Sequence, residues 1–233
     1  ISGAIATETA TMYIGSVGGG GEFFSGLIDD VRIYNYARTA DQVLVDYNAG
    51  SAAHLGAGAD PNEGNPLVLY LNFDENIGTT VYDKSGGGNN ASFTNMESAD
   101  WVAGKYGTCL DFNSDPGYEG IYGNVVSTNP SNYTTEAWIR PTAYPAERSN
   151  IIRIGGRYLS LDSDKKLSIY CYGLASEGYH ASNSEIPLNT WTHVAHVYDG
   201  ANMHMYINGI LDRKVSNSGS PSQGMASYDI GCE

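Results

Sequence analysis

The sequence predicts an all-β protein in which short strands form a sandwich. The 233 residues include 18 Tyr and 29 Gly, and aromatic residues make up 11% of the chain. Aromatic residues favour strands, while Gly, Asn and Ser favour the turns that join them. The length is sufficient for one large β domain or two small ones, since a sandwich can use roughly 200 residues as a single unit.

The charge of the chain limits its partners. Twenty-six acidic and 12 basic residues give a formal net charge of -14 at pH 7. This charge repels phosphate backbones and provides no basic surface, so we expect no nucleic-acid partner. No run approaches the roughly 18 apolar residues of a membrane-spanning helix, so we expect no membrane insertion.

The first 48 residues are predicted to contain two strands and a short helix. Residues 11–17 and 23–36 have the composition of strands, and the glycines at 18–21 mark a turn between them. The sequence Thr39-Ala-Asp-Gln42 has the form of a capping box, in which the Thr and Gln side chains satisfy free backbone donors at a helix start. The helix that follows is expected to have three apolar or aromatic residues on one side, namely Val43, Leu44 and Tyr47.

A linker and a long strand-rich segment follow. Residues 49–66 are rich in Ala, Gly, Asn and Pro and contain almost no large apolar side chain, which predicts an exposed linker. Asn208-Gly209 between two alternating arms is a strong hairpin signal. The predicted strands of this part are residues 67–73, 109–112, 133–140, 150–154, 157–162, 166–172, 191–199 and 203–214.

Several blocks of the sequence resemble the LamG-like branch of the concanavalin A-like lectin/glucanase superfamily. The resemblance covers most of the chain, and it implies an all-β, concanavalin A-like two-sheet jelly-roll sandwich with one short helix. The blocks are LVLYLNFDENIGTTVYDKSGGGNNASF (67–93), WVAGKYGTCLDFN (101–113), YTTEAWIRP (133–141), WTHVAHVYDGANMHMYINGILDRK (191–214) and FFSGLIDDVRIYNYARTADQV (23–43).

The order of these blocks is rotated relative to the family. The block at 23–43 resembles the closing strand and helix of such a domain, yet it comes first. We therefore expect residues 1–48 to be the closing strands and helix of a sandwich, 49–66 a linker, and 67–233 the main body of a sandwich. A body without its closing strand exposes unpaired backbone groups and an apolar face, which another segment must cover.

Three segments could cover that face: residues 1–48 of the same chain, the same residues of a neighbouring molecule, or the next repeat of a longer polypeptide. Residues 2–17 align weakly with 218–233, and folding back would make one of the two redundant. We therefore favour head-to-tail strand exchange between copies of the chain or adjacent repeats, in a filament subunit or structural repeat. The residues expected at this joint are Phe23, Leu27, Ile28, Val31, Ile33 and Tyr34.

The resemblance also implies a structural calcium ion. In the family, a loop resembling DKSGGGNN and a closing strand resembling GLIDDV often share calcium, a cation that prefers carboxylate, amide and carbonyl oxygens. Two structural roles compete, because Asp83 could cap a turn and Asp30 could pair with Arg32 on the same strand face. The corresponding residues here are Asp30, Asp74, Asp83 and Asn89.

Catalysis is not expected from this sequence. Glucanases of the superfamily carry Glu-x-Asp-x-x-Glu on one strand, which places two carboxylates on one sheet face, and the chain has no such run. The alternative to a structural role is carbohydrate binding or adhesion, with glycans as partners and tyrosine rings as stacking surfaces. The tyrosines predicted to lie in loops are Tyr118, Tyr122, Tyr144 and Tyr179.

Three cysteines, Cys109, Cys171 and Cys232, cannot all pair within one chain. Cys232 could form a disulfide with either of the other two or cross-link two subunits, and the sequence leaves these pairings open. Acidic surfaces are common in secreted proteins, and together with the resemblance this predicts a secreted or cell-surface protein.

Overall fold

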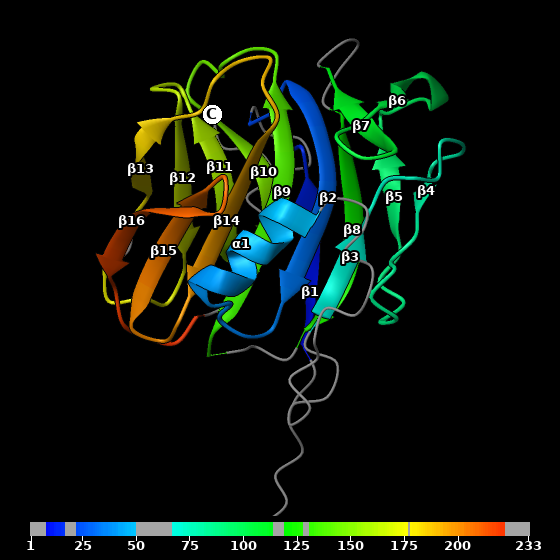
Figure 1. Ribbon diagram of the computed structural model, residues 1–233. Coiled ribbons are helices and arrows are strands. Elements are labelled where there is room, and N and C mark those ends of the chain that lie inside the picture. The colour runs from blue at the N-terminus through cyan, green and yellow to red at the C-terminus, as the bar shows by residue number, and fades with distance from the viewer. Residues whose placement is uncertain are drawn as a thin grey trace, which may run out of the picture.

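Two antiparallel sheets packed face to face make up the described part of the chain, which comprises residues 8–16, 22–49, 67–113, 119–127, 131–176 and 178–221 of the computed structural model (Figure 1). Sheet A has the order β13 (His180–Glu185), β12 (Lys166–Cys171), β11 (Arg157–Asp162), β10 (Arg148–Ile154), β1 (Glu8–Ile14), β8 (Gly120–Ser127), β5 (Ala91–Thr94) and β4 (Thr80–Val81). Sheet B has the order β16 (Ile210–Ser216), β15 (Asn202–Ile207), β14 (Thr192–Tyr198), β9 (Tyr133–Pro141), β2 (Gly26–Tyr34), β7 (Thr108–Phe112) and β6 (Trp101–Ala103), and β3 (Leu67–Leu71) also pairs with β2. With the helices α1 (Ala40–Ala49) and η2 (Ser98–Asp100), these elements confirm the predicted all-β sandwich.

The first two strands of the chain lie in the middle of the two sheets. β1 pairs with β8 on one side, from Glu8 opposite Ser127, and with β10 on the other. β2 pairs with β9 from Gly26 to Tyr34, and its opposite edge pairs with β7 and β3. Because each strand has its neighbours within the same chain, residues of the first segment complete both sheets.

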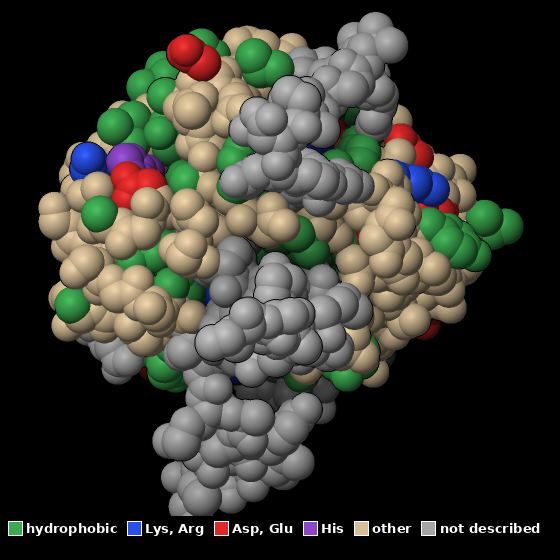
Figure 2. All heavy atoms as spheres, turned by 90° about the horizontal axis from the view of Figure 1, so that it is seen from below, with side chains coloured by type: hydrophobic (Ala, Val, Ile, Leu, Met, Phe, Trp, Pro, Cys, Tyr) green, Lys and Arg blue, Asp and Glu red, His purple; other side chains and the backbone are tan. Residues whose placement is uncertain are grey.

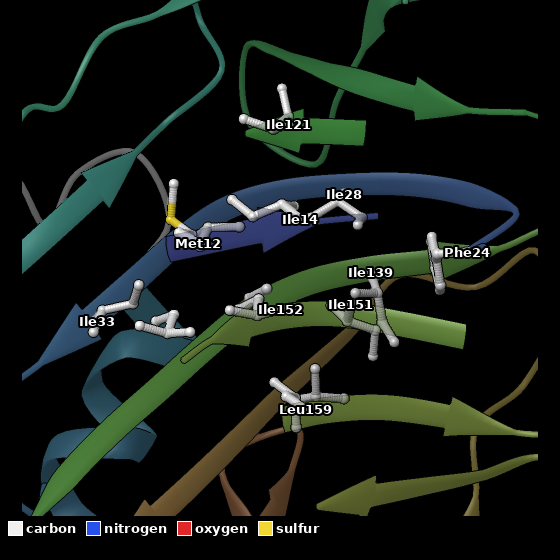
Figure 3. Packing of buried hydrophobic residues seen from close by; sticks show 14 of the residues in the cluster. Met12, Ile14, Phe24, Ile28, Ile33, Ile121, Ile139, Ile151, Ile152 and Leu159 are labelled. Atoms are coloured by element: carbon white, nitrogen blue, oxygen red, sulfur yellow. The ribbon is translucent and has the colours of Figure 1, made fainter. Parts of the chain in front are cut away.

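The core between the sheets also contains side chains of the first segment. Met12 and Ile14 from β1 and Ile28 from β2 are fully buried, and they pack in one cluster with Ile139 and Ile152 of the main body (Figure 3). Alternating side chains of a strand point to opposite faces, so each central strand contributes every second residue to this interior. The hydrophobic effect therefore holds the first segment against the body over both of its strands.

The apolar residues that we expected at a joint between molecules lie inside one chain instead. Leu27, Ile28, Val31, Ile33 and Tyr34 are all buried, and Phe23 is partly exposed. The structure therefore has the folded-back arrangement and gives no support to strand exchange, because the paired edges of β9, β7, β8 and β10 leave no place for a second donor. Most of the C-terminal partner of the weak internal alignment lies outside the described residues.

The predicted capping box begins helix α1. The Thr39 backbone N–H donates to Gln42 Oε1 at 2.9 Å, and the Gln42 backbone N–H donates to Thr39 Oγ1 at 3.3 Å. Val43 is fully buried against Ala195 and Val197 of β14, so the helix covers the outer face of sheet B (Figure 1). Leu44 is 42% exposed and lies at the margin of this contact, near Gly209. No helix among the described residues is long and apolar enough to cross a membrane.

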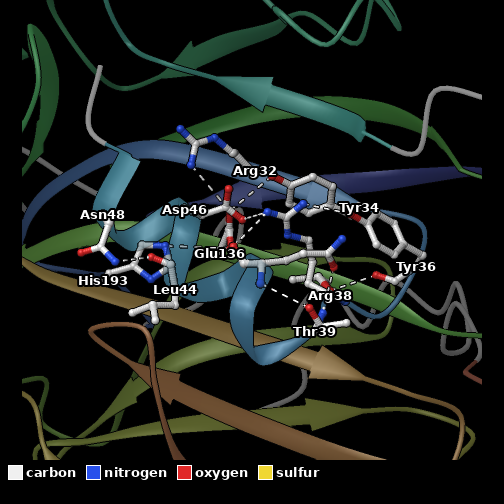
Figure 4. A network of polar contacts seen from close by, with 12 residues as sticks. Arg32, Tyr34, Tyr36, Arg38, Thr39, Leu44, Asp46, Asn48, Glu136 and His193 are labelled. Carbon is white, nitrogen blue, oxygen red and sulfur yellow. Dashed lines mark hydrogen bonds and ion pairs between the residues drawn. The ribbon is translucent and has the colours of Figure 1, made fainter. Parts of the chain in front are cut away.

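A buried network of charged side chains lies between α1 and sheet B (Figure 4). Arg32 of β2 is 3.6 Å from Asp30 and 3.6 Å from Glu136 of β9. Arg38, just before the helix, forms an ion pair with Asp46 of α1. A buried charge is costly unless it is paired, so this network fixes how the first segment sits on the body.

The charge balance of this network depends on Glu136. Complete burial, together with the Asp46 carboxylate, raises the pKa of Glu136 to about 8, although Arg32 and Arg38 oppose the shift. Burial also raises the pKa of Asp46, which faces Glu136 and Arg38. A proton held by Glu136 removes the repulsion between the two neighbouring carboxylates, which is favourable for groups removed from water.

We predict that Glu136→Gln will alter the pH dependence of stability. The folded pKa of Glu136 lies above its unfolded value of about 4.5, so its contribution to stability is complete below that value and is lost as pH rises through about 8. Between pH 7 and 9 the melting temperature of the wild type should therefore fall relative to that of Glu136→Gln, as thermal melts would show. The control Glu185→Gln changes an exposed carboxyl and should leave the wild-type profile unchanged. Parallel profiles for wild type and Glu136→Gln would contradict the prediction.

We also predict that the chain is a monomer in dilute solution. β1 and β2 are paired inside their own chain, so strand exchange is not needed to close the sandwich. Light scattering after size exclusion should give a mass close to 24.9 kDa over a range of micromolar concentrations. A ladder of larger species that grows with protein concentration would show that exchange competes with folding back.

Candidate functional site

A row of tyrosine and arginine side chains crosses the outer face of sheet A. Tyr13 of β1 lies opposite Tyr122 of β8 and opposite Arg153 of β10. Arg153 lies opposite Tyr158 of β11, which in turn lies opposite Tyr170 of β12. We call these five residues the tyrosine row. Each is in direct register with the next, so the row runs across five adjacent strands.

The row faces away from the core. Met12 and Ile14, on either side of Tyr13, are buried between the sheets, and so are Ile152 and Leu159 beside Arg153 and Tyr158. Successive residues of a strand point to opposite faces, so the tyrosine row lies on the outer face. The alternation also means that a shift of one residue in any strand would break the row.

The rings of the row contact one another. Tyr13 and Tyr122 are edge to face, with ring centroids 5.6 Å apart, and Tyr158 and Tyr170 have the same separation. Aromatic pairs prefer such geometry because the positive edge of one ring meets the negative face of the other. The Arg153 guanidinium carbon is 5.7 Å from the Tyr13 ring centroid and 4.8 Å from that of Tyr158, so it joins the two ring pairs.

Two further tyrosines extend the row beyond β12. The centroids of Tyr172 and Tyr179 lie 4.7 and 4.9 Å from that of Tyr170. Tyr122, Tyr172 and Tyr179 expose 41%, 36% and 37% of their surface, whereas Tyr158 exposes 8%. The row is therefore most buried at Tyr158, and its rings are exposed toward both ends. The exposed rings present apolar faces and phenol hydroxyls on the same surface.

An open, acidic hollow of about 420 Å³ adjoins the row. Arg148 connects the two, because its guanidinium carbon lies 3.4 Å from the Tyr179 ring centroid and it donates two hydrogen bonds, of 2.6 and 3.2 Å, to Asp162. The Asp162 carboxylate also accepts a bond from Ser168. The residues that line the hollow are Glu22, Glu147, Arg148, Asp162, Ser163 and Asp164.

The predicted calcium ligand Asp83 organises a turn. Its carboxylate accepts backbone hydrogen bonds from Tyr70 at 3.0 Å, from Ser85 at 2.9 Å and from Asn89 at 2.9 Å. The Asn89 side chain donates to the Val68 carbonyl at 2.9 Å. These bonds hold the loop between β4 and β5 against β3, which is the turn-capping role that competed with metal binding.

Asp74 and Asp30 are likewise held by donors from the protein. Asp74 accepts from the Thr108 backbone at 3.0 Å, and Asp30 accepts from the Tyr70 hydroxyl at 2.7 Å in addition to its ion pair with Arg32. Among the described residues, no group of three or more His, Cys, Asp or Glu side chains is arranged to hold a metal ion. Calcium also takes amide and carbonyl oxygens, so a calcium ion at Asp30, Asp74, Asp83 and Asn89 stays a prediction.

Asp29 has a structural role that the sequence did not indicate. It accepts hydrogen bonds from the backbone N–H groups of Lys105 and Tyr106 at 2.9 and 3.1 Å, and thereby fastens the loop between β6 and β7 to β2. Burial and the neighbouring Asp30 raise the pKa of Asp29 to about 8. Gly104 permits this contact, because a Cβ there would come within 2.6 Å of the carboxylate.

The cysteines and the loop tyrosines are also placed by the structure. Cys109 and Cys171 are buried free thiols, and burial raises the pKa of Cys109 to about 12, which makes it unreactive. Cys232 lies outside the described residues, so its predicted pairing remains a prediction. Of the four tyrosines expected in loops, Tyr122 lies in strand β8, Tyr179 extends the tyrosine row, Tyr144 packs against the core, and Tyr118 lies outside the described residues.

Comparison with known proteins gives one match. A laminin G family model described as the concanavalin A-like lectin/glucanases superfamily matches residues 1–44 and 115–232. These two segments include all five members of the tyrosine row. No curated protein and no solved structure matches the chain.

Proposed function

The chain belongs to the concanavalin A-like lectin/glucanases superfamily, and we propose that it is a non-catalytic carbohydrate-binding module whose ligand lies along the tyrosine row. The observation that carries this proposal is the register that aligns Tyr122, Tyr13, Arg153, Tyr158 and Tyr170 on one face of sheet A. Neighbouring strands are about 4.8 Å apart, so the row extends over roughly 20 Å, enough for several linked sugar units.

The chemistry of the row suits a glycan. A sugar ring has an apolar face of C–H groups that packs on an aromatic ring, and its hydroxyls need hydrogen-bond partners. The exposed rings of Tyr122, Tyr172 and Tyr179 provide such faces, and phenol hydroxyls and guanidinium N–H groups provide the partners. Ligand sites commonly combine apolar surface with a few well-placed polar groups in this way.

The positions of the carboxylates support a non-catalytic role. Glycoside hydrolysis requires two carboxyl groups, about 5 to 10 Å apart, that reach the substrate. The tyrosine row contains no carboxylate. In the adjoining hollow, Asp162 accepts hydrogen bonds from Arg148, Glu22 accepts one from Asn150, and Asp164 accepts one from the Lys166 backbone. The interacting pair Glu136 and Asp46 lies buried between α1 and sheet B. Asp29 and Asp83 are engaged by backbone donors.

The charge of the surface supports a glycan rather than a polyphosphate ligand. The formal net charge is -14, and on the face shown in Figure 2 the few Lys and Arg side chains of the described residues lie apart from one another. Nucleic-acid sites need a continuous basic surface. Binding of glycans at a cell surface or in a secreted protein is consistent with this acidic character.

We predict that Tyr13→Ala will weaken glycan binding about tenfold or more. The variant loses one ring contact, and the apolar surface buried by such a contact contributes roughly 1.5 kcal/mol or more to the binding free energy. A glycan array should first identify the bound sugars, and titration calorimetry should then compare the variants. Tyr122→Ala, which removes a ring that is 41% exposed, should weaken binding in the same direction with little change in melting temperature.

The control for this experiment is Ile210→Ala, which removes a side chain that is 69% exposed on β16 of sheet B. It should bind as the wild type does. Absence of any bound glycan on a dense array, or equal loss of binding in Ile210→Ala, would contradict the assignment of the tyrosine row.

A further inference from the structure

Arg153 is the only charged member of the tyrosine row, and it lies at its centre. Its guanidinium carbon lies 4.8 Å from the Tyr158 ring centroid and 5.7 Å from that of Tyr13, so rings on two neighbouring strands flank it. Its Nε donates to the Gly155 carbonyl at 3.5 Å. Arg153 is partly exposed on the outer face of sheet A.

Arg153 lacks the carboxylate partner that Arg32, Arg38 and Arg148 have. Arg32 and Arg38 form ion pairs in the network beneath α1, and Arg148 on the same strand as Arg153 binds Asp162 with two hydrogen bonds. Among the described residues, no carboxylate lies within ion-pair distance of Arg153. In a chain with 26 acidic and 12 basic residues, this arginine is a cation held on a binding surface without its own counter-ion.

The geometry of the guanidinium suits a carboxylate of a ligand. The flanking rings attract the cation through their faces, which limits its motion and leaves its edge free for hydrogen bonding. A guanidinium edge matches the two oxygens of a carboxylate, and such charge-assisted pairs are about twice as strong as neutral hydrogen bonds. The free edge of the Arg153 guanidinium can therefore bind a planar anion such as a carboxylate.

The acidic hollow limits how many charges the ligand can carry. Glu22, Glu147, Asp162 and Asp164 line the hollow at the Tyr179 end of the row, and only Arg148 offsets them. A densely sulfated or phosphorylated chain along the row would meet these carboxylates and be repelled. An isolated carboxylate at Arg153, between neutral sugars, avoids that repulsion.

We infer that the tyrosine row binds a glycan in which a uronic acid unit, flanked by neutral sugars, places its carboxylate on Arg153. This inference rests on the proposed function and adds to it the chemical class of the ligand. Tyr13 and Tyr158 position the guanidinium, and the tyrosines farther along the row contact the neutral units on either side.

The test uses the full chain and matched pairs of oligosaccharides. Uronate-bearing oligosaccharides with xylan, pectin and alginate backbones are each compared with the same oligosaccharide after reduction of its carboxyl groups, and heparin serves as the dense polyanion. We expect at least one uronate-bearing form to bind about tenfold or more tighter than its reduced counterpart, with the preference falling as salt is raised. Heparin should bind more weakly than that oligosaccharide.

Variants at Arg153 test whether this residue causes the preference for the uronate form. Arg153→Gln should abolish the preference for the uronate form, because that form loses its charge-assisted pair and therefore more affinity than the reduced form, and Arg153→Lys should keep part of the preference, because Lys retains the charge but not the planar fork. Lys214→Gln removes the same charge from an exposed position on β16 of sheet B and should leave the preference intact. Thermal melts check that each variant is folded.

The outcomes separate this inference from the proposed function. Equal affinity for the uronate and reduced forms, tighter binding of heparin, or an unchanged preference in Arg153→Gln would overturn the inference. If only neutral glycans bind and Tyr13→Ala weakens them, the proposed function stands and the uronate assignment fails. If no glycan binds at all, the proposed function itself fails.

Discussion

The backbone pairing of β1 and β2 at the centre of the two sheets is the constraint on which the rest of the structure depends. Without β1, β8 and β10 would face each other across an empty strand position, and without β2 the same would hold for β9 and β7. Unpaired backbone groups in a buried sheet are costly, so neither half of the sandwich is complete until the first segment docks. Docking also places Tyr13 in the middle of the tyrosine row.

The charged network beneath α1 adds specificity to this docking. The apolar residues of β2 would tolerate small shifts along the groove, but Arg32 of β2 reaches Glu136 of β9 only when the two strands are correctly placed. The Arg38–Asp46 pair lies within the first segment and holds α1 to the residues before it. Buried ion pairs contribute little net stability compared with apolar packing, because desolvation offsets their attraction. Their effect here is to restrict the first segment to one register, and the register of β1 and its neighbours is what aligns the tyrosine row.

The sequence predicted those features that have a local cause. The capping box at Thr39 needs only four residues, and the hairpin between β15 and β16 follows from Asn208 and Gly209, which have φ angles of 51° and 74°. Strand β8 was missed because its two glycines suggest a loop, although Gly123 is required where a Cβ would come within 3.1 Å of the Ala91 side chain. The tyrosine row could not be predicted, because its five members come from five strands whose register is set by tertiary packing. Folding back and strand exchange use the same residues in the same contacts, so sequence patterns could not separate them.

If the tyrosine row binds a glycan as proposed, the position of Tyr13 couples that binding to closure of the fold. The other members of the row belong to the main body, so a ligand that contacts Tyr13 and its neighbours on both sides bridges the first segment and the body. Such a ligand binds only the docked state, and at a concentration of 100 times its Kd it would stabilise that state by about 2.7 kcal/mol. The same linkage acts in reverse, because any change that loosens docking, such as ionisation of buried Glu136, removes Tyr13 from the row and would lower the affinity for the proposed ligand. The binding surface and the closure of the sandwich are therefore one equilibrium, even though the charged network and the tyrosine row lie on different sheets.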